Sequence, residues 1–434
     1  MVRRSLPSLV LALALLSMLV PAAAQAATRP TMPYAWLDVA SDTAATVRWL
    51  PVTGATSYEV LLDGAQATEV TETGVVISDL SPASLHTVQV LAKGAGGSSS
   101  KSDPVPIVTR ASAACTHFVS TAGSDAGTGS ATSPWRTITR LVQSWEPGTV
   151  GCLDGAFVED VSIMRGGTSA AKVVLRSRPG SVASIRGRLW VARGADHVVV
   201  AHLSLDGRAI KDTSRNSLPS PTVNAANTML LDNDITNVRT RVCVVLGSIR
   251  GYGAAVAPVL AYNRIHDCGR RGQNTHHGIY MESTRRAKIV HNVIFDNADR
   301  GIQLYPDAQG SLIAGNLIDG NGTGIIFSGA EGFASSRNVV IRNVISGSQV
   351  RSNLEHYWEQ GPRRVGVGNV AARNCLGGAR QGNFATPLVG YRAAGNATGA
   401  LRFENRALDN LRPTSDSGCR NLLLSRMLPL ARIA

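Results

Sequence analysis

Short apolar segments, each interrupted by one asparagine, recur through the second half of the chain. The segments are LLDNDI, LAYNRI, IVHNVI, IAGNLI and VIRNVI. Their asparagines are separated by 30, 29, 24 and 27 residues, at Asn233, Asn263, Asn292, Asn316 and Asn343. A period of roughly 20 to 30 residues made of strands, without a helical pattern, is typical of a solenoid in which each repeat forms one coil.

Each repeat also carries a second apolar strand that begins at a glycine. These strands are VCVVLGS, GIYMES, GIQLYPD and GIIFSG, and Gly278, Gly301 and Gly324 are spaced 23 residues apart. The pattern predicts a right-handed parallel β-helix whose stacked coils bury ladders of aliphatic side chains. The members of the two expected ladders are Leu260, Ile289, Ile313 and Val340, and Ile265, Ile294, Ile318 and Ile345. We expect the repeated asparagines to occupy a turn, where they tolerate left-handed backbone, and to stack their amides along the axis.

Residues 30–110 show a different pattern, in which short alternating strands are separated by turn residues. The runs are TVRWL, SYEVLLDG, EVTETGVVISDL and HTVQVLAKG, and they predict a β-sandwich. This segment resembles a fibronectin type III domain. The residues that carry the resemblance are Trp49, Tyr58, Leu80 and Pro82, with VQVLAKG and SKSDPV after them. His86 departs from the family, which usually places a corner tyrosine there; the resemblance implies a spacer or adhesion module.

Residues 115–420 resemble the pectate-lyase-like family of secreted β-helices. The family's entry signature is matched by FVSTAGSDAGTGSATSPWRTITRLVQ, in which Pro134 to Ile138 would open a helix that caps the solenoid. PGTVGCLDGAFVE resembles its first coil, and FATPLVG and LRPTSDSG loosely resemble its closing coil. The resemblance implies an all-β chain, with a β-helix domain of roughly eight coils over residues 115–434 after the fibronectin type III sandwich.

The first 26 residues have the form of a cleavable secretion signal. Arg3 and Arg4 precede an apolar run from Leu9 to Val20, and Ala24-Gln25-Ala26 has the small-x-small form of a cleavage site. Because the run is too short for a hydrocarbon core of about 30 Å, it predicts a removable signal rather than a membrane anchor. We therefore expect a secreted protein, extracellular or at the cell surface, with no membrane insertion.

Six cysteines in an exported chain permit disulfides, and their spacings match no zinc signature. The simplest pairing joins neighbours in sequence: Cys115 with Cys152, Cys243 with Cys268, and Cys375 with Cys419. The alternative is one or more buried free thiols, most readily in the middle pair.

The formal charge is +13, and it falls to +11 when Arg3 and Arg4 leave with the signal. A basic excess favours polyanionic partners such as acidic polysaccharide. The basic residues are scattered and mostly arginine, without a dense run or interleaved aromatic residues. This argues against a nucleic-acid partner and leaves a solvated basic surface as the alternative. We expect the protein to be a monomer.

One coil contains an insertion. The distance from ladder asparagine to strand glycine is 9 residues in one coil (301−292) and 8 in the next (324−316), but 15 in the coil with CGRRGQNTHH (278−263). Long loops on a rigid scaffold are where function tends to reside. This loop brings Arg270, Arg271, His276 and His277 to one end of the following strands.

Strand alternation predicts which side chains the loop would meet. If the aliphatic residues of GIYMES and GIQLYPD point inward, Tyr280, Glu282, Gln303 and Tyr305 point outward. With coils about 4.8 Å apart, Tyr280 should lie beside Gln303, and Glu282 beside Tyr305. Aromatic rings pack against sugar rings and cations bind uronate carboxylates, so the patch predicts a polysaccharide groove. The residues expected to bind substrate there are Arg270, Arg285, Arg300, Gln303, Tyr305 and Asp307, with Asp299 also flanking the patch.

The family resemblance implies cleavage of acidic polysaccharide by β-elimination or by hydrolysis. Elimination needs a base for the C5 proton, a cation for the carboxylate and a donor to the leaving oxygen. The residues expected to act are His276 or His277 as the base, Arg271 (or Arg270 or Arg285) as the cation, and Tyr280 or Tyr305 as the donor.

Hydrolysis would need two carboxylates roughly 5 to 9.5 Å apart. Glu282 with Asp307 is the only such pair placed on this face, and the Asp-rich set of the polygalacturonases is missing from the sequence. Glu282 remains a catalytic candidate, and elimination is favoured. The competing interpretation of the patch is a solvated turn next to ordinary strand tyrosines.

No cofactor is required by the sequence, but calcium is a candidate because many members of the resembling family use it. Asp267 and Asp296 each lie four residues after a ladder asparagine and should stack on adjacent coils, close to Asn297 and Asn321. Stacked carboxylates repel one another unless a cation or a proton intervenes. The favoured alternative is that both aspartates cap turn amides and face water.

These observations favour a secreted carbohydrate-active β-helix protein that binds and cleaves an acidic, uronate-containing polysaccharide, with a lyase preferred to a glycosidase or epimerase. The competing class is a non-catalytic surface protein whose solenoid serves as an adhesive rod. A concave groove with converging polar groups at Tyr280 would favour the first class, and a convex, scattered patch would favour the second.

Overall fold

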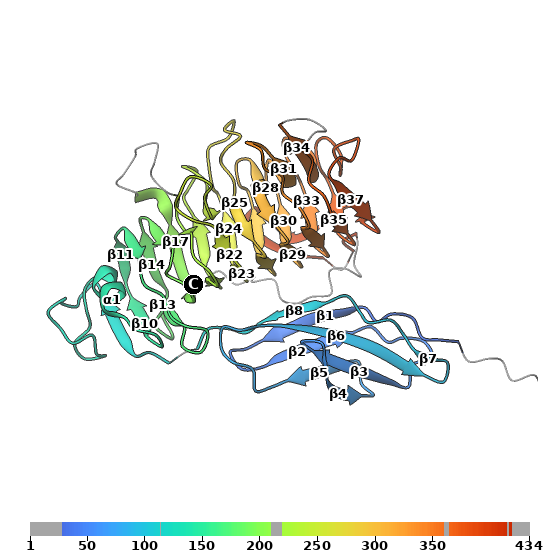
Figure 1. Cartoon of the computed structure of the whole chain (residues 1–434), viewed down its shortest axis with the longest axis horizontal. Coiled ribbons are helices and arrows are strands. Elements are labelled where there is room, and N and C mark those ends of the chain that lie inside the picture. The colour runs from blue at the N-terminus through green and yellow to red at the C-terminus, as the bar shows by residue number, and fades with distance from the viewer. Residues whose placement is uncertain (1–27, 113, 210–218, 360–363, 415, 419–434) are drawn as a thin grey trace, which may run out of the picture.

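The computed structural model describes residues 28–112, 114–209, 219–359, 364–414 and 416–418. The predicted signal, residues 1–26, lies outside the described residues. In the part described, the structure is all-β apart from the short helix α1 (Ile138–Ser144) and isolated 3-10 turns, among them Gly207–Ala209 and Arg406–Leu408. The predicted fold class is confirmed: a fibronectin-type sandwich is followed by a parallel β-helix (Figure 1).

The N-terminal sandwich consists of two antiparallel sheets. One contains β1 (Ala35–Ala40), β2 (Ala45–Trp49) and β5 (Gly74–Ile77). The other contains β4 (Ala65–Val70), β3 (Ser57–Leu62), β6 (Leu85–Gly94) and β7 (Gly97–Ser98), with β8 (Val105–Val108) paired to β6. Trp49 and Tyr58 pack against each other in the core, with ring centroids 5.3 Å apart. At the corner, His86 bonds Asp63 and Ser84, at 2.8 Å each, in place of a tyrosine hydroxyl.

The solenoid has three parallel sheets, and each coil contributes one strand to each sheet. The first sheet contains β9 (His117–Ser120), β10 (Val150–Asp154), β13 (Val173–Ser177), β16 (Val198–Ala201), β19 (Met229–Leu231), β23 (Val259–Ala261), β26 (Lys288–Val290), β29 (Leu312–Ala314), β32 (Val339–Ile341), β35 (Asn369–Ala372) and β37 (Tyr391–Ala394). The second contains β11 (Ala156–Val158), β14 (Ala183–Arg186), β17 (Leu203–Asp206), β20 (Asp234–Thr236), β24 (Arg264–His266), β27 (Val293–Phe295), β30 (Leu317–Asp319), β33 (Val344–Ser346), β36 (Cys375–Gly377) and β38 (Ala397–Thr398). Connections between parallel strands are right-handed for steric reasons, which gives the coil its hand.

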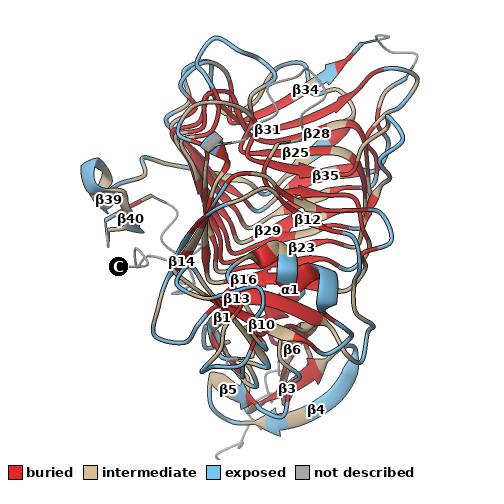
Figure 2. Ribbon diagram, turned by 90° about the vertical axis from the view of Figure 1, so that its left-hand side faces the viewer, coloured by how far each residue is buried: buried red, intermediate tan, exposed pale blue. Residues whose placement is uncertain are grey.

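The third sheet carries the site. Its strands are β12 (Val161–Ile163), β15 (Leu189–Val191), β18 (Thr222–Val223), β21 (Val244–Leu246), β25 (Ile279–Arg285), β28 (Arg300–Gln309), β31 (Thr323–Gly329) and β34 (Leu354–Trp358), with β22 (Ala255–Val256) paired to β25. Strands β25, β28, β31 and β34 lie on the side of the solenoid away from the sandwich in both views (Figures 1 and 2).

The aliphatic ladders predicted from the repeats are present. Leu260, Ile289, Ile313 and Val340 align in the first sheet and are fully buried. The set from Ile265 to Ile345 aligns in the same way in the second sheet. Gly278, Gly301 and Gly324 also stack, since a Cβ on Gly278 would lie 2.8 Å from the carbonyl oxygen of Gly301. Close approach of successive coils therefore requires these glycines.

The repeated asparagines form an amide ladder that is longer than expected. Side-chain Nδ2 donates to the next Oδ1 from Asn233 through Asn263, Asn292, Asn316, Asn343 and Asn374 to Asn396. The asparagines themselves do not use the left-handed backbone that they were expected to tolerate. The left-handed residue is the one before each asparagine, as at Tyr262 (φ 62) and His291 (φ 57), because the asparagine itself must turn its amide inward.

Two segments close the solenoid. Helix α1 packs Ile138, Leu141 and Val142 onto the first coil, as predicted, with Thr137 as its N-cap. At the other end, Phe384 of FATPLVG forms a parallel bridge with Leu354, so this part of the predicted closing coil continues the solenoid. The other part, LRPTSDSG, instead belongs to an antiparallel hairpin of β39 (Phe403–Asn405) and β40 (Asn410–Pro413). It lies beside the solenoid (Figure 2) and packs Leu411 on the outer face of the second sheet.

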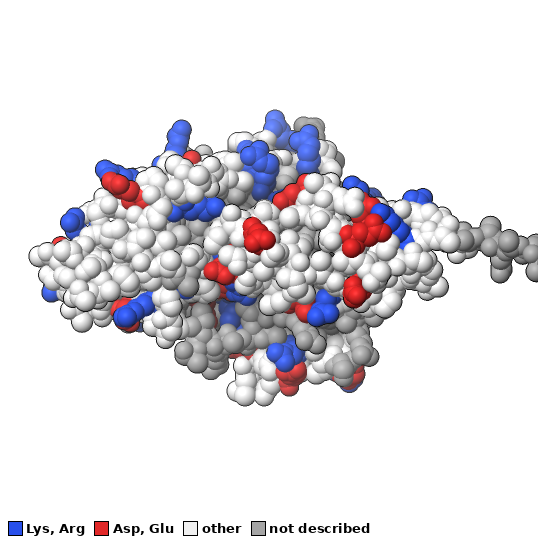
Figure 3. Space-filling view, turned by 90° about the horizontal axis from the view of Figure 1, so that it is seen from below, with Lys and Arg blue, Asp and Glu red and all other residues white. Residues whose placement is uncertain are grey.

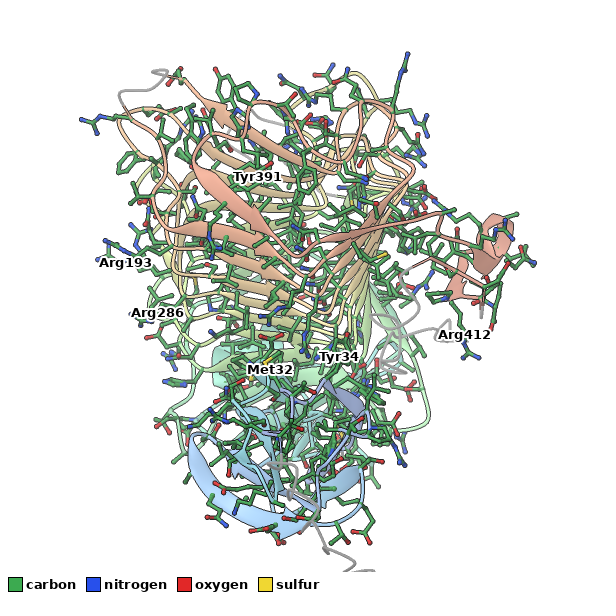
Figure 4. The ribbon with its side chains drawn as sticks, turned by 90° about the vertical axis from the view of Figure 1, so that its right-hand side faces the viewer. Met32, Tyr34, Arg193, Arg286, Tyr391 and Arg412 are labelled. Atoms are coloured by element: carbon green, nitrogen blue, oxygen red, sulfur yellow. A yellow bond between two sulfur atoms is a disulfide. The ribbon has the colours of Figure 1, made fainter. Side chains whose placement is uncertain are left out.

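The sandwich covers the outer face of the first sheet. Outward side chains of this sheet, including Val199, Leu231 and Ala261, share one buried cluster with the core of the sandwich. Polar contacts also hold the sandwich against the solenoid. The Tyr262 hydroxyl donates to the Val108 carbonyl at 2.7 Å, and the Arg342 guanidinium lies 4.4 Å from the centroid of the Tyr34 ring. Figure 4 labels Tyr34 at this junction. With the hairpin on the second sheet, the third sheet is left as the open face.

Two of the three predicted disulfides are confirmed. Cys115 is bonded to Cys152, and Cys243 to Cys268. The third predicted pair includes Cys419, which lies outside the described residues. The middle pair is therefore a disulfide and not the pair of free thiols considered as an alternative.

Candidate functional site

A groove of about 830 Å³ runs along the open face of the third sheet. Its lining combines tyrosines, arginines, one carboxyl group and one histidine. The lining residues that carry chemistry are Arg250, Tyr252, His277, Tyr280, Glu282, Arg300, Gln303, Tyr305, Arg351 and Tyr357. These polar groups line a concave surface. This is the arrangement that was expected of a carbohydrate-active protein and not of an adhesive rod.

The floor of the groove follows strand alternation. Tyr280 pairs with Gln303 across β25 and β28, as predicted, and the Tyr280 and Tyr305 rings stack with centroids 6.3 Å apart. A register shift between Met281 and Ser283 places Glu282 at an irregularity opposite Tyr305. The Gln303 side-chain oxygen is buried and has no hydrogen-bond partner among the described residues. A buried acceptor without a partner is costly unless a ligand or water satisfies it.

His277 lies at one wall of the groove, where the inserted loop meets β25. Its Nδ1 is 3.3 Å from Asp299 Oδ2, although the alignment is too poor for a hydrogen bond. Burial lowers the pKa of His277 to about 4, against the opposing effect of Asp299. The imidazole is therefore neutral near pH 7.

Asp299 is held by two guanidinium groups. Arg300 contacts one of its oxygens, and Arg351 donates to the other at 3.0 Å. Burial opposes ionisation of Asp299, but the adjacent His277 and the charges of the two arginines together hold its pKa below the ordinary value. Asp299 is therefore a fixed carboxylate behind His277.

Glu282 is held by the loop that follows β21. The backbone N–H of Ile249 donates to its Oε1 at 3.2 Å, and Ser248 Oγ lies 3.4 Å from the same oxygen. Burial raises the pKa of Glu282 above its ordinary value. Burial also raises the pKa of Tyr280, so this phenol stays protonated throughout the neutral range.

The structure separates several predicted residues from the groove. Arg270 and Arg271 are exposed on the inserted loop, outside the lining, because the loop carries them away from the strands. His276 is outside the lining as well; its Nδ1 accepts from the backbone N–H of Arg270 at 3.1 Å and so stabilises the loop. Arg285 and Asp307 pair with each other farther along β25 and β28, also outside the lining.

Four of the lining residues that carry chemistry were not predicted from the sequence. Arg250 and Tyr252 belong to a loop between β21 and β22, and loop shape does not follow from strand periodicity. Arg351 and Tyr357 come from the coil of β34, whose sequence SNLEHYW was not aligned with the others. The repeat could have revealed this coil, since Leu354 continues the ladder of inward aliphatic side chains from Ile325.

The aspartates considered for calcium are paired with cations from the chain. Asp267 binds Arg239 at 2.6 Å and lies 3.1 Å from His266, while Asp296 binds Arg406 of the C-terminal hairpin at 2.6 Å. Guanidinium groups thus relieve the repulsion that the stacked carboxylates would otherwise experience. The arrangement does not fit a calcium site, since the aspartates already have compensating charge.

A family model described as a periplasmic copper-binding protein (NosD) matches residues 222–378, about a third of the chain. Within the described residues, no group of three or more His, Cys, Asp or Glu side chains is arranged to hold a metal ion. Cys243 and Cys268 are joined in a disulfide. The matched segment therefore does not fit copper through these ligand types.

Solved structures resemble the chain in shape. XylC in complex with xylose has a TM-score of 0.48 at 12% identity, covering 65% of this chain and 68% of that one. Pectate lyase Pel9A has a TM-score of 0.45 at 12% identity, covering 65% of this chain and 76% of that one. The protein FN3tt has a TM-score of 0.18 at 21% identity, covering 19% of this chain and 97% of that one. No curated protein sequence matches the chain.

Charged side chains are scattered on the face of the molecule opposite to the groove. Seen from below, basic and acidic side chains are dispersed and form no single charged patch on that face (Figure 3). No helix in the described part of the chain has the length and apolar character needed to cross a bilayer.

Proposed function

We propose that the protein is a secreted carbohydrate-active enzyme that binds an acidic polysaccharide in the third-sheet groove and cleaves it by β-elimination. The observation that carries the proposal is a groove lined by tyrosines and arginines on the one solenoid face that no other part of the described chain covers. Sugar rings stack on aromatic faces, and guanidinium groups bind carboxylates in a planar, bidentate manner.

Charge in the groove favours an anionic ligand. Three arginines line it, against Glu282 as the one carboxyl group in the lining, and burial shifts that carboxyl group toward its neutral form. Arg300 and Arg351 are engaged by Asp299. Arg250 is exposed and forms no ion pair with the described acidic residues, so it is the cation that we assign to the uronate carboxylate, in place of Arg271.

His277 is the base that we assign to elimination. With Asp299 on the Nδ1 side, Nε2 is the nitrogen available to take the C5 proton of the uronate. The electrons of that bond form the C4–C5 double bond while the C4–oxygen bond breaks. Asp299 stabilises the imidazolium as it forms, which is the role of a carboxylate behind a general base. Tyr280, kept protonated by burial, gives its proton to the leaving oxygen.

Hydrolysis is less well supported. Asp307, the partner proposed for Glu282, is bonded to Arg285 and Gln309 outside the groove. Glu355 also has a raised pKa because of burial, but it lies three rungs from Glu282, or about 14 Å along the axis. Paired glycosidase carboxylates are at most about 9.5 Å apart.

The test is incubation of the mature protein with galacturonate, mannuronate, guluronate and glucuronate polymers, with and without calcium, followed by ultraviolet detection of unsaturated ends. We expect unsaturated ends from at least one polymer, lost in His277→Ala and retained in Glu282→Gln. If the parent protein instead forms new reducing ends without unsaturated ends, and Glu282→Gln abolishes their formation, the reaction is hydrolysis. Binding without cleavage would identify the groove as an adhesive surface and contradict the assignment as an enzyme.

A further inference from the structure

We infer that Trp190 and Tyr252 form a distal sugar-binding subsite, so that the ligand is a polymer chain lying along the solenoid axis and not a short saccharide. This inference rests on the proposed function of the groove. It adds the length and direction of the substrate, which neither the lining residues nor the proposed chemistry define.

The outward side chains of the third sheet form one continuous column. Trp190 pairs with Thr222, Thr222 with Val245, Val245 with Tyr280, and Tyr280 with Gln303. Leu189 and Val191 are buried in the solenoid core on either side of Trp190, so the indole faces outward. Three rungs separate Trp190 from Tyr280, which is about 14 Å along the axis. A pyranose unit is comparable in length with one rung, so several units are needed to reach both.

Small residues connect the two aromatic regions. Thr222 and Val245 line the groove between Trp190 and Tyr280 and do not obstruct a chain that passes over them. Tyr252 lines the groove beside this stretch, 39% exposed. Its ring meets the ring of Trp190 edge to face, with centroids 6.1 Å apart and an interplanar angle of 88°. Trp190 lies just outside the groove lining and Tyr252 within it, so the two perpendicular rings would extend the groove at this end and offer a sugar ring an aromatic corner.

Hydrogen bonds hold this corner in place before any ligand arrives. Trp190 Nε1 donates to Asn224 Oδ1 at 2.9 Å, and Asn224 Nδ2 donates to the carbonyl of Gly253 at 2.8 Å. Asn224 therefore joins the indole to the loop that bears Tyr252. A pre-organised aromatic site loses little conformational entropy on binding.

The same loop also reaches the reacting end of the groove. Its ends are closed by a bridge between Ser248 and Gly253, and Ser248 and Ile249 hold Glu282. Arg250 lies between these contacts and Tyr252 in the sequence, and it also lines the groove. One loop thus presents an aromatic ring to a distant sugar unit and a guanidinium group to a nearer carboxylate.

The experiment measures binding as a function of ligand length. Galacturonate, mannuronate and guluronate oligomers, from dimers to octamers, are titrated calorimetrically into the mature protein in a His277→Ala background, which keeps the ligand intact. We expect affinity to rise with length until both regions are filled. Trp190→Ala/Tyr252→Ala should weaken the longest oligomer about tenfold, in line with the loss of aromatic contacts, and leave the shortest bound oligomer unchanged. Tyr252→Phe keeps the ring and should bind like the parent.

The outcomes separate the two proposals. If the parent binds no oligomer or polymer, the proposed function and the distal subsite both fail. If the parent binds and the double variant binds long oligomers equally well, only the distal subsite fails. If the double variant weakens short and long oligomers alike, the loop acts through Glu282 and not through a distant sugar, which also overturns the inference.

Discussion

At the residue scale, His277 and Asp299 set the pH response that the proposed reaction should show. The base must be neutral, and burial lowers the pKa of His277 to about 4. The rate of cleavage should therefore be maximal with respect to this group above pH 4 and should fall as the pH is lowered through 4. His277→Ala should lower kcat by roughly a hundred- to ten-thousand-fold, the usual range for loss of a general base. Steady-state kinetics across acidic pH would check this.

Asp299 provides a second test, because its charge raises the pKa of His277. In Asp299→Asn the acidic limb of the kcat/KM profile should move to lower pH, since the imidazolium loses its carboxylate. The value of kcat should also fall. A purely structural role would reduce activity or stability without moving the limb. An unmoved limb would remove Asp299 from the proposed mechanism.

How far the site was predictable depends on which part of a coil each residue occupies. Tyr280, Gln303 and Tyr305 are on strands, where alternation decides which side they face, and all three line the groove. Arg271 and Tyr252 are on loops, whose direction depends on contacts such as those of Asn224 and cannot be obtained from periodicity. The insertion could be located from spacing, but not its shape.

At the element scale, the amide ladder should be a main source of solenoid stability. Asn292 is fully buried; its Nδ2 donates to the carbonyl of Leu260 and to Asn316, and its Oδ1 accepts from Asn263. Asn292→Ala would leave buried partners unsatisfied and should cost about 3 kcal/mol. Asn396→Ala, at the partly buried end of the ladder, should cost about 1 kcal/mol. Denaturant unfolding of both variants gives the comparison, and equal losses would contradict a cooperative ladder.

The disulfide between Cys243 and Cys268 should matter for function as well as for stability. It links neighbouring coils at the base of the inserted loop that ends at His277. Replacing both cysteines by alanine should cost about 3 kcal/mol and raise KM several-fold, because the loop loses its anchor. The matched control is Cys115→Ala/Cys152→Ala, which lies far from the groove in sequence and should reduce stability without affecting KM. Equal effects on KM would argue against anchoring.

The solenoid was the most predictable element, since each coil must place the same residue types at the same points to stack. The register of Leu260 with Ile289 follows directly from the repeat. The hairpin over the second sheet was not predictable, because it breaks the repeat. Its position depends on Arg406 bridging Asp296 and Asp319, a contact between residues that are distant in sequence.

At the scale of the whole molecule, the sandwich is part of the solenoid's structure and more than a spacer. A signal for this was present in the sequence: first-sheet strands such as VVVA and MLL are apolar throughout, as expected of strands buried on both faces. The interpretation of residues 30–110 as a spacer or adhesion module took no account of this pattern. A chain that lacks residues 30–110 would expose Val199 and Leu231, and such surfaces promote aggregation.

The junction should also make the protein sensitive to acid. His291 is fully buried between the two domains, where its Nε2 contacts the carbonyl of Pro106 at 3.2 Å and its ring stacks on Tyr262. Burial lowers the pKa of His291 to about 4, and the charge of Arg110 acts in the same direction. The neutral form is therefore favoured in the folded protein, whereas the unfolded chain binds a proton near its ordinary pKa of about 6.5.

Neutral His291 thus makes its full contribution to the free energy of unfolding above the pKa of the unfolded chain. This contribution is lost as the pH falls from that value toward 4. The full loss is roughly 3 kcal/mol. His202, whose pKa burial also lowers to about 4, acts with the same sign near Arg110 and Arg176. His291→Gln should remove part of this slope while keeping a donor for Pro106. Thermal unfolding from neutral pH to pH 4 would show it, with His117→Gln, at the half-buried start of β9 away from the junction, as the control. Parallel slopes in all three proteins would mean that the junction does not titrate.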